Sequence, residues 1–150
     1  MKVLFIGGTG VISSACSRLA VERGVDLFLL NRGETSRPVP DGAQVLQCDF
    51  RDREAARRVL AGRSFDAVVD WIAFTPDQVE ADIDLFRGRT GQYIFISTAS
   101  AYQKPPRSLP ITESTALHNP FWEYSRAKIA GEDRLVQAYR REAFPITIAK

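Results

Sequence analysis

The chain has 150 residues, of which 45% are hydrophobic and 25% are charged, values typical of one globular domain. Its formal net charge is only +2 and basic residues are interleaved with acidic ones, so we expect no nucleic acid as a partner. One histidine is too few for a multi-histidine metal site, and the two cysteines, Cys16 and Cys48, are expected to be core residues in a reducing compartment rather than metal ligands.

Six short apolar segments recur along the chain, and each is expected to be a β-strand. They are rich in β-branched and aromatic residues and mostly lack period-two alternation, as strands buried on both faces do. In chain order they are 3–6, 25–30, 43–48, 65–74, 92–97 and 146–149. The first of them is too short for a signal peptide or a membrane span, so we expect a cytoplasmic protein without membrane association.

Helical patterns separate these strands. The first has an apolar stripe at helical spacing, formed by Ile12, Ala15, Cys16, Leu19 and Ala20. Three further helices are expected over 52–61, 76–87 and 119–141, beginning respectively with Asp52 as N-cap, with Pro76, and with Asn119 as N-cap before Pro120. Alternating strands and helices predict an α/β fold of the Rossmann type, a doubly wound parallel sheet of about six strands with helices on both faces.

The segment FIGGTGVIS, residues 5–13, follows the first strand and opens the first helix, where a phosphate-binding turn is needed. Gly7 permits a sharp turn, and Gly10 lets backbone N–H groups approach a pyrophosphate at the positive end of the helix. Ser13 stands at the third position of this G-x-x-G-x-x-G spacing, where a glycine is usual. We therefore expect a dinucleotide-binding loop, to which Thr9, Val11 and Ile12 also belong.

The end of the second strand bears on which dinucleotide is bound. An enzyme selecting NAD usually places an acid here for the ribose 2′-hydroxyl, whereas an arginine can hold the 2′-phosphate of NADP. Asn31 and Arg32 occupy this point, and no acid occurs before Glu34. NADP is therefore favoured over NAD, the alternative being that Arg32 is simply a solvated loop residue.

Together these segments resemble the extended short-chain dehydrogenase/reductases, or NAD-dependent epimerase/dehydratase family, over the whole chain. GGTGVIS, CDFRD, VVDWIAF, FISTASAY and YSRAK occur in the order of that family and at the expected strand ends. The resemblance implies that Asp49 and Phe50 flank the adenine and that Trp71, Ile72 and Ala73 line the nicotinamide side. Independently of it, Asp49 fits a helix cap and Trp71 fits a core residue.

The resemblance also implies three catalytic residues: Thr98, four residues before Tyr102, and Tyr124 and Lys128 of YSRAK. Residues four apart share a helix face, so Lys128 is expected beside Tyr124. Free tyrosine titrates near pH 10, about three units above neutral pH, and a nearby ammonium and an oxidised nicotinamide stabilise phenolate. Lys128 would also bond the nicotinamide ribose, and Thr98 the substrate oxygen. The alternative is that the three residues share no site.

Two features depart from the family pattern. Dehydratases of the family have an Asp-Glu pair after the Ser/Thr, where this chain has Ala99 and Ser100, which disfavours a 4,6-dehydratase. Family members are also roughly twice as long, so residues 1–150 are expected to be an NAD(P)-binding domain with the catalytic residues, the C-terminal substrate lobe being absent from this chain.

We therefore expect an NAD(P)-dependent epimerase or oxidoreductase acting on a hydroxyl or carbonyl of a sugar or nucleotide-sugar. The alternative is a module on the same fold without turnover, which senses NADP(H) or binds RNA or protein. Relatives pair two subunits through a four-helix contact, and segment 119–141 has apolar residues on more than one side, so a homodimer is also expected.

Overall fold

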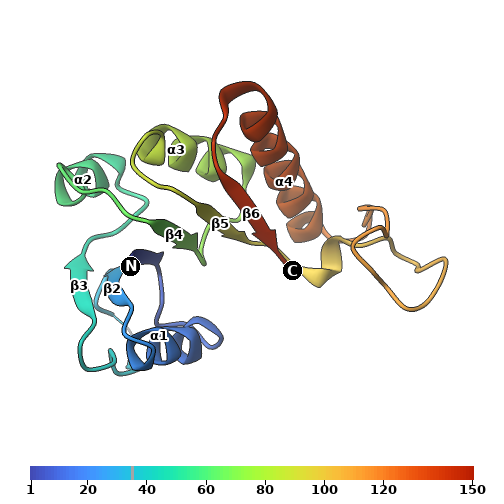
Figure 1. Ribbon diagram of the computed structural model, residues 1–150. Helices are drawn as coiled ribbons and strands as arrows, with labels where there is room; N and C mark the ends of the chain where they lie inside the picture. The colour runs from blue at the N-terminus through green and yellow to red at the C-terminus, as the bar shows by residue number, and fades with distance from the viewer. Residues whose placement is uncertain (35) are drawn as a thin grey trace.

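The computed structural model describes residues 1–34 and 36–150, and a parallel sheet forms its centre (Figure 1). Its strands are β1 (Lys2–Ile6), β2 (Asp26–Asn31), β3 (Gln44–Gln47), β4 (Ala67–Asp70), β5 (Tyr93–Ile96) and β6 (Ile146–Ala149). They are arranged as β3-β2-β1-β4-β5-β6, and every neighbouring pair is parallel. The chain winds outward from β1 in one direction and from β4 in the other, which confirms the predicted doubly wound fold.

Helices cover both faces of this sheet. They are α1 (Ser13–Glu22), α2 (Arg53–Val59), α3 (Pro76–Phe86) and α4 (Glu123–Glu142), with a short 3-10 turn at Ala99–Ala101. One core is formed by one face of the sheet with α2, α3 and α4, and a second core lies between the other face and α1. In Figure 1, α3 and α4 run next to each other on the side of the sheet opposite to α1.

The close approach of α3 and α4 depends on a glycine in α4. A Cβ atom at Gly131 would lie 3.3 Å from Val79 Cγ2 on α3 and 3.5 Å from Phe95 Cζ on β5. Such contacts are tighter than or at the limit of ordinary side-chain packing, so Gly131 sets how deeply α4 sits against α3 and the sheet.

Two helix starts follow the predicted caps. The Asp52 side chain accepts a hydrogen bond from the Ala55 amide, 3.0 Å away, at the start of α2. Helix α3 begins at Pro76, and Thr75 and Gln78 form a capping box before it.

The predicted start of the last helix at Asn119 is wrong, because α4 begins at Glu123. Asn119 is instead buried in a turn, where its Nδ2 donates to the Ser100 carbonyl oxygen (2.8 Å) and to Ser125 Oγ (3.3 Å). Its Oδ1 accepts from the Phe121 amide. The side chain that was expected to cap the helix thus ties the segment before α4 to the end of β5.

The fourth strand is shorter than the predicted 65–74. It ends at Asp70, whose Oδ1 accepts hydrogen bonds from the amides of Ile72 (2.6 Å) and Ala73 (2.7 Å). A side chain that binds the next amides in this way replaces the sheet ladder with a turn. Residues 71–74 therefore leave the sheet.

Within the part of the chain that the structure describes, no helix has both the length and the apolar character that crossing a bilayer would need.

Candidate active site

A cleft of about 690 Å³ opens at the carboxyl ends of the parallel strands. Its walls are the turn after β1, the segments after β2 and β3, the turn after β4, the end of β5 and two side chains of α4. The lining residues are Gly7, Gly8, Thr9, Gly10, Val11, Ile12, Ser13, Leu30, Asn31, Arg32, Gly33, Glu34, Arg37, Cys48, Asp49, Phe50, Arg51, Trp71, Ile72, Phe74, Ile96, Ser97, Tyr124 and Lys128. Ligands of doubly wound sheets bind at this edge, near the point where the strand order reverses.

The glycine turn after β1 has the conformation expected of a phosphate-binding loop. Gly7 and Gly8 have φ angles of 100° and 92°, which residues with a side chain rarely adopt. A Cβ atom at Gly8 would lie 2.7 Å from Leu29 Cδ2, so this position, which the sequence motif left unassigned, is the most restricted of the loop. Ser13 Oγ accepts from the Gly10 amide (2.8 Å), so the serine at the third motif position closes the loop onto the start of α1.

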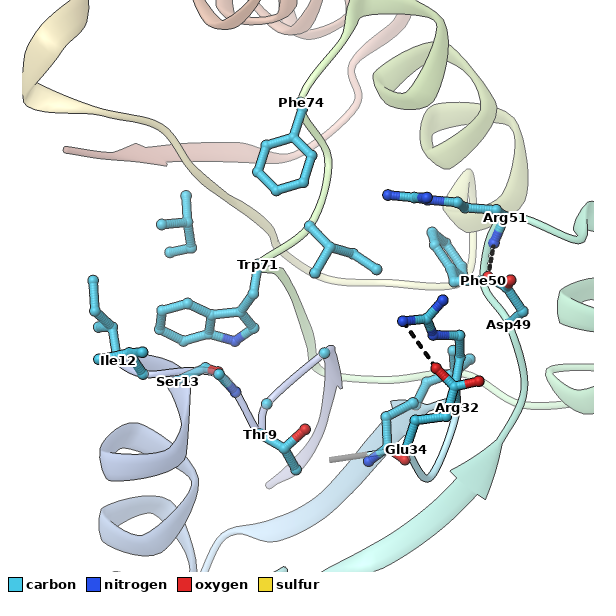
Figure 2. A pocket seen from close by; sticks show the side chains of 18 of the residues that line it. Thr9, Ile12, Ser13, Arg32, Glu34, Asp49, Phe50, Arg51, Trp71 and Phe74 are labelled. Atoms are coloured by element: carbon cyan, nitrogen blue, oxygen red, sulfur yellow. Dashed lines mark hydrogen bonds and ion pairs between the residues drawn. The ribbon is translucent and has the colours of Figure 1, made fainter. Parts of the chain in front are cut away.

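Charged side chains gather at the end of the cleft formed by the segments after β2 and β3. Arg32 pairs with Glu34 at 3.1 Å, and both side chains are more than half exposed. Asp49 Oδ1 accepts from the Arg51 amide at 3.0 Å. In Figure 2 these four side chains and Phe50 lie at one end of the cleft, and Ile12 and Trp71 lie at the other. Glu34, Arg37 and Arg51 were not predicted as site residues, since no motif marks these three positions.

Two buried donors of the cleft have no hydrogen-bond partner among the described residues: Asn31 Nδ2 and Trp71 Nε1. Leaving a buried N–H without an acceptor costs folding free energy, and a bound ligand can supply that acceptor. Together with glycines whose Cβ atoms would contact the cleft wall, they are a donor set that fits a dinucleotide with ribose, phosphate and base acceptors.

Lys128 is only 2% exposed, and its ammonium is fixed by two backbone carbonyl oxygens. Nζ donates to the Ala73 oxygen at 2.6 Å and to the Ile96 oxygen at 2.7 Å. Burial lowers the pKa of Lys128 to about 8, against the opposing effect of the carboxylates of Asp70 and Glu132. A protonated lysine at this depth remains a strong charge near neutral pH.

Tyr124 lies one helical turn before Lys128 and also lines the cleft. Its ring centroid is 5.9 Å from Lys128 Nζ. The rings of Trp122 and Phe74 pack against it, with centroids 4.8 Å and 6.1 Å away. These neighbours fix the Tyr124 ring in the wall of the cleft that the glycine turn also lines.

Two of the predicted site residues do not line the cleft. Ala73 contributes its carbonyl oxygen to Lys128 instead. Thr98 Oγ1 lies 2.9 Å from Ser100 Oγ and accepts from the Ser100 amide, while its neighbour Ser97 lines the cleft and donates to Glu132. The other predicted residues, from Gly7 to Lys128, are brought together there, and Thr98 as a catalytic residue stays a prediction.

Comparison with known proteins agrees with this architecture. The model of the NAD dependent epimerase/dehydratase family matches residues 3–150. UDP-glucose 4-epimerase of Lactobacillus helveticus is 29% identical over 98% of this chain, and 2′-dehydrokanamycin reductase of Streptomyces kanamyceticus is 26% identical over 93%. The chain spans 50% of the first relative and 39% of the second.

Solved structures show the same fold. UDP-glucose 4-epimerase from Brucella ovis in complex with NAD superposes with a TM-score of 0.84 at 22% identity, covering 98% of this chain and 50% of that one. The enzyme from Bifidobacterium longum in complex with NAD+ and UDP gives a TM-score of 0.83 at 20% identity, covering 99% of this chain and 52% of that one.

Proposed function

The chain belongs to the NAD-dependent epimerase/dehydratase family, and we propose that it binds a nicotinamide dinucleotide and takes part in oxidation or reduction at a hydroxyl or carbonyl of a sugar or nucleotide-sugar. The observation that carries the proposal is that Tyr124 and Lys128 line the same cleft as the glycine turn. The names of two of the similar proteins, a UDP-glucose 4-epimerase and one bound to NAD+ and UDP, support a nucleotide-sugar.

In this proposal each part of the cleft has one task. Backbone N–H groups of the glycine turn bind the pyrophosphate at the positive end of α1. The residues after β2 and β3 hold the adenosine end, and Trp71 and Ile72 hold the nicotinamide side. Once bound, the nicotinamide supplies hydride transfer.

The proton of the reaction moves through the side chains of α4. The Tyr124 phenolic oxygen gives a proton to, or takes one from, the substrate oxygen. The charged Lys128 ammonium stabilises phenolate and bonds the ribose, which orients the reacting parts. We propose Thr98 as a second hydroxyl for the same substrate oxygen, which requires Oγ1 to turn from Ser100 toward the cleft.

A direct test of binding is a melting scan with NAD, NADP and UDP-sugars. A ligand that binds only the native state, present at a hundred times its dissociation constant, adds about 2.7 kcal/mol to the free energy of unfolding. We expect a rise in melting temperature with a dinucleotide and a further rise with a UDP-sugar. If neither dinucleotide shifts the melting temperature or gives heat on calorimetric titration, the proposed function is wrong. A response to dinucleotide alone would favour a sensing module.

The choice between NADP and NAD is testable at Arg32. We propose that its guanidinium holds a 2′-phosphate and that NADP binds more tightly than NAD. Because a charge-assisted hydrogen bond contributes about 1.5–3 kcal/mol, Arg32→Ala should weaken NADP at least about tenfold and leave NAD nearly unchanged, as measured by calorimetric titration. Arg57→Ala is the matched control, since Arg57 is in a similarly exposed ion pair on α2, outside the cleft lining. Tighter binding of NAD by the wild type would refute the preference.

We also propose that the chain forms a homodimer through the outer sides of α3 and α4. Tyr139 on α4 is 60% exposed, and Phe121 and Trp122 before it are exposed as well. Sedimentation at micromolar concentration should give a dimer that Tyr139→Arg dissociates. Leu19→Arg, at an exposed leucine of α1, should not change the assembly. A wild-type monomer would count against this interface.

A further inference from the structure

A buried acidic cluster lies behind the cleft, where β4, β5 and α3 meet. It consists of Asp70, Asp82 and Tyr93, each no more than 1% exposed. The Tyr93 hydroxyl lies 2.8 Å from Asp82 Oδ2 and 3.5 Å from Asp70 Oδ2. Arg53 of α2 reaches Asp82 Oδ1 at 3.0 Å, with its own side chain 29% exposed.

Two buried carboxyl groups therefore share the Tyr93 phenol, and Asp82 alone also pairs with the Arg53 guanidinium. Burial and the neighbouring Asp70 raise the pKa of Asp82 well above its usual range. A pair of this kind favours one proton between the two carboxyl groups, because two adjacent buried carboxylates repel each other. Removing two carboxyl groups from water costs free energy that an apolar core would not lose. The contacts of the cluster with its surroundings therefore indicate its role.

The outward contact of the cluster is the turn after β4. Asp70 Oδ1 accepts both the Ile72 amide and the Ala73 amide, while Oδ2 faces Tyr93. These two bonds set the direction in which the chain leaves the sheet, and they aim the Ala73 carbonyl oxygen at Lys128 Nζ, 2.6 Å away.

This carbonyl fixes one of the three N–H donors of the Lys128 ammonium, and the Ile96 carbonyl fixes a second. The third N–H is left along the remaining tetrahedral direction of the ammonium. Lys128 itself lines the cleft. Two carboxylates act on Lys128, Asp70 from β4 and Glu132 from α4. Behind Asp70 lies the Asp82–Arg53 ion pair, and Glu132 is paired with Lys150 at 2.9 Å. The rings of Phe95, Phe74 and Tyr124 surround the Lys128 Nζ, with centroids 4.4 Å, 5.0 Å and 5.9 Å away.

We propose that Asp70 is a positioning residue of the active site. Its carboxyl, held by Asp82 and Tyr93, fixes the Trp71–Ala73 turn, and through the Ala73 carbonyl it orients the Lys128 ammonium and keeps it charged. The inference rests on the proposed function for what Lys128 does to a ligand. The link from Asp70 to Lys128 is a property of the protein alone and is tested without cofactor.

The experiment follows the Lys128 ammonium by NMR in the chain labelled with ¹³C at lysine Cε. Only four lysines are present, Lys2, Lys104, Lys128 and Lys150, and a Lys128→Met spectrum assigns the signal. The wild type should titrate at about 8. In the double variant Asp70→Asn/Asp82→Asn, the amide oxygens keep the acceptors of the turn, and Glu132 is the one carboxylate left facing Lys128 among those named above, so the Lys128 pKa should fall by about one unit. Asp84→Asn, at an exposed carboxylate of α3, is the matched control and should leave it unchanged.

A second variant tests position instead of charge. Asp70→Ala removes the acceptor, so the amides of Ile72 and Ala73 should exchange with solvent at least about tenfold faster, whereas they stay protected in Asp70→Asn. If the double variant does not fold, Asp70→Asn alone measures the loss of charge. An unchanged Lys128 titration in these Asn variants, or unchanged amide exchange in Asp70→Ala, would overturn the proposal. If the wild type and all of these variants fail to bind a dinucleotide, the proposed function is refuted instead.

Discussion

In a longer form that includes a C-terminal substrate lobe, Tyr124→Phe is expected to abolish turnover of a UDP-sugar, lowering kcat at least about 10²-fold, while leaving the dissociation constant of the dinucleotide within about twofold of wild type. Phenylalanine keeps the ring between Trp122 and Phe74, so the wall of the cleft is unchanged. Only the oxygen that moves the proton is lost. The free energy of unfolding should change by no more than about 1 kcal/mol, the net value of a hydrogen bond.

The test combines initial rates, followed at the absorbance of the reduced nicotinamide or by product analysis, with calorimetric titration of the dinucleotide. Tyr139→Phe is the control, because Tyr139 is an exposed tyrosine on the same helix. It should have wild-type rates. Substantial turnover by Tyr124→Phe would show that another group transfers the proton, and Ser97, which lines the cleft, would be the next candidate.

Lys128→Met should lose both turnover and dinucleotide affinity, the latter by at least about tenfold, because one ammonium has two tasks. Any residual turnover should require a higher pH, since phenolate loses its nearby cation. The Ala73 and Ile96 carbonyl oxygens also lose their donor. Lys104→Met, in the loop before α4, is the control and should behave as wild type.

Stability gives an independent check on Lys128. Its pKa is about 8 in the folded chain and 10.5 in the absence of burial. Between these values the unfolded chain binds more protons than the folded one, so stability rises with pH, and the cost of burying the charge is fully present below pH 8. At about 1.4 kcal/mol per unit, the free energy of unfolding of wild type relative to Lys128→Met should rise by roughly 3 kcal/mol from pH 8 to 10.5. Urea unfolding across this range measures it, and a flat difference would contradict the burial of a charged lysine.

The parts of the fold that depend on local pattern could be predicted from the sequence. The succession of strands and helices, the glycine turn and the helix starts at Asp52 and Pro76 follow from apolar runs, glycines and caps a few residues apart. The end of β4 could not be predicted, because Val-Val-Asp-Trp-Ile-Ala continues as an apolar run. Only the structure shows that Asp70 turns back to bind the amides that follow it.

The wrong helix start at Asn119 has the same origin. Asn119 before Pro120 has the appearance of a cap, yet its side chain binds Ser100, nineteen residues earlier. Thr98 stays a prediction as a catalytic residue; its neighbour Ser97 lines the cleft, and the Ser97 hydroxyl donates to Glu132, 35 residues away. Contacts over such separations decide where these side chains find their partners, and no local spacing encodes them.

Gly131 sets how closely α4 packs against α3 and β5, so a substitution there should also move the active-site residues of α4. A helix behaves as a stiff rod that rises 1.5 Å per residue, so Gly131 lies about 4.5 Å along the axis from Lys128 and about 10 Å from Tyr124. A methyl group at residue 131 would meet Val79 at 3.3 Å, and relieving that contact lifts the rod by a few tenths of an ångström or tilts it. A misplacement of 1 Å can cost 10²-fold in rate. The position of Tyr124 is therefore set in part by Gly131, a residue of the α3–α4 contact that does not line the cleft.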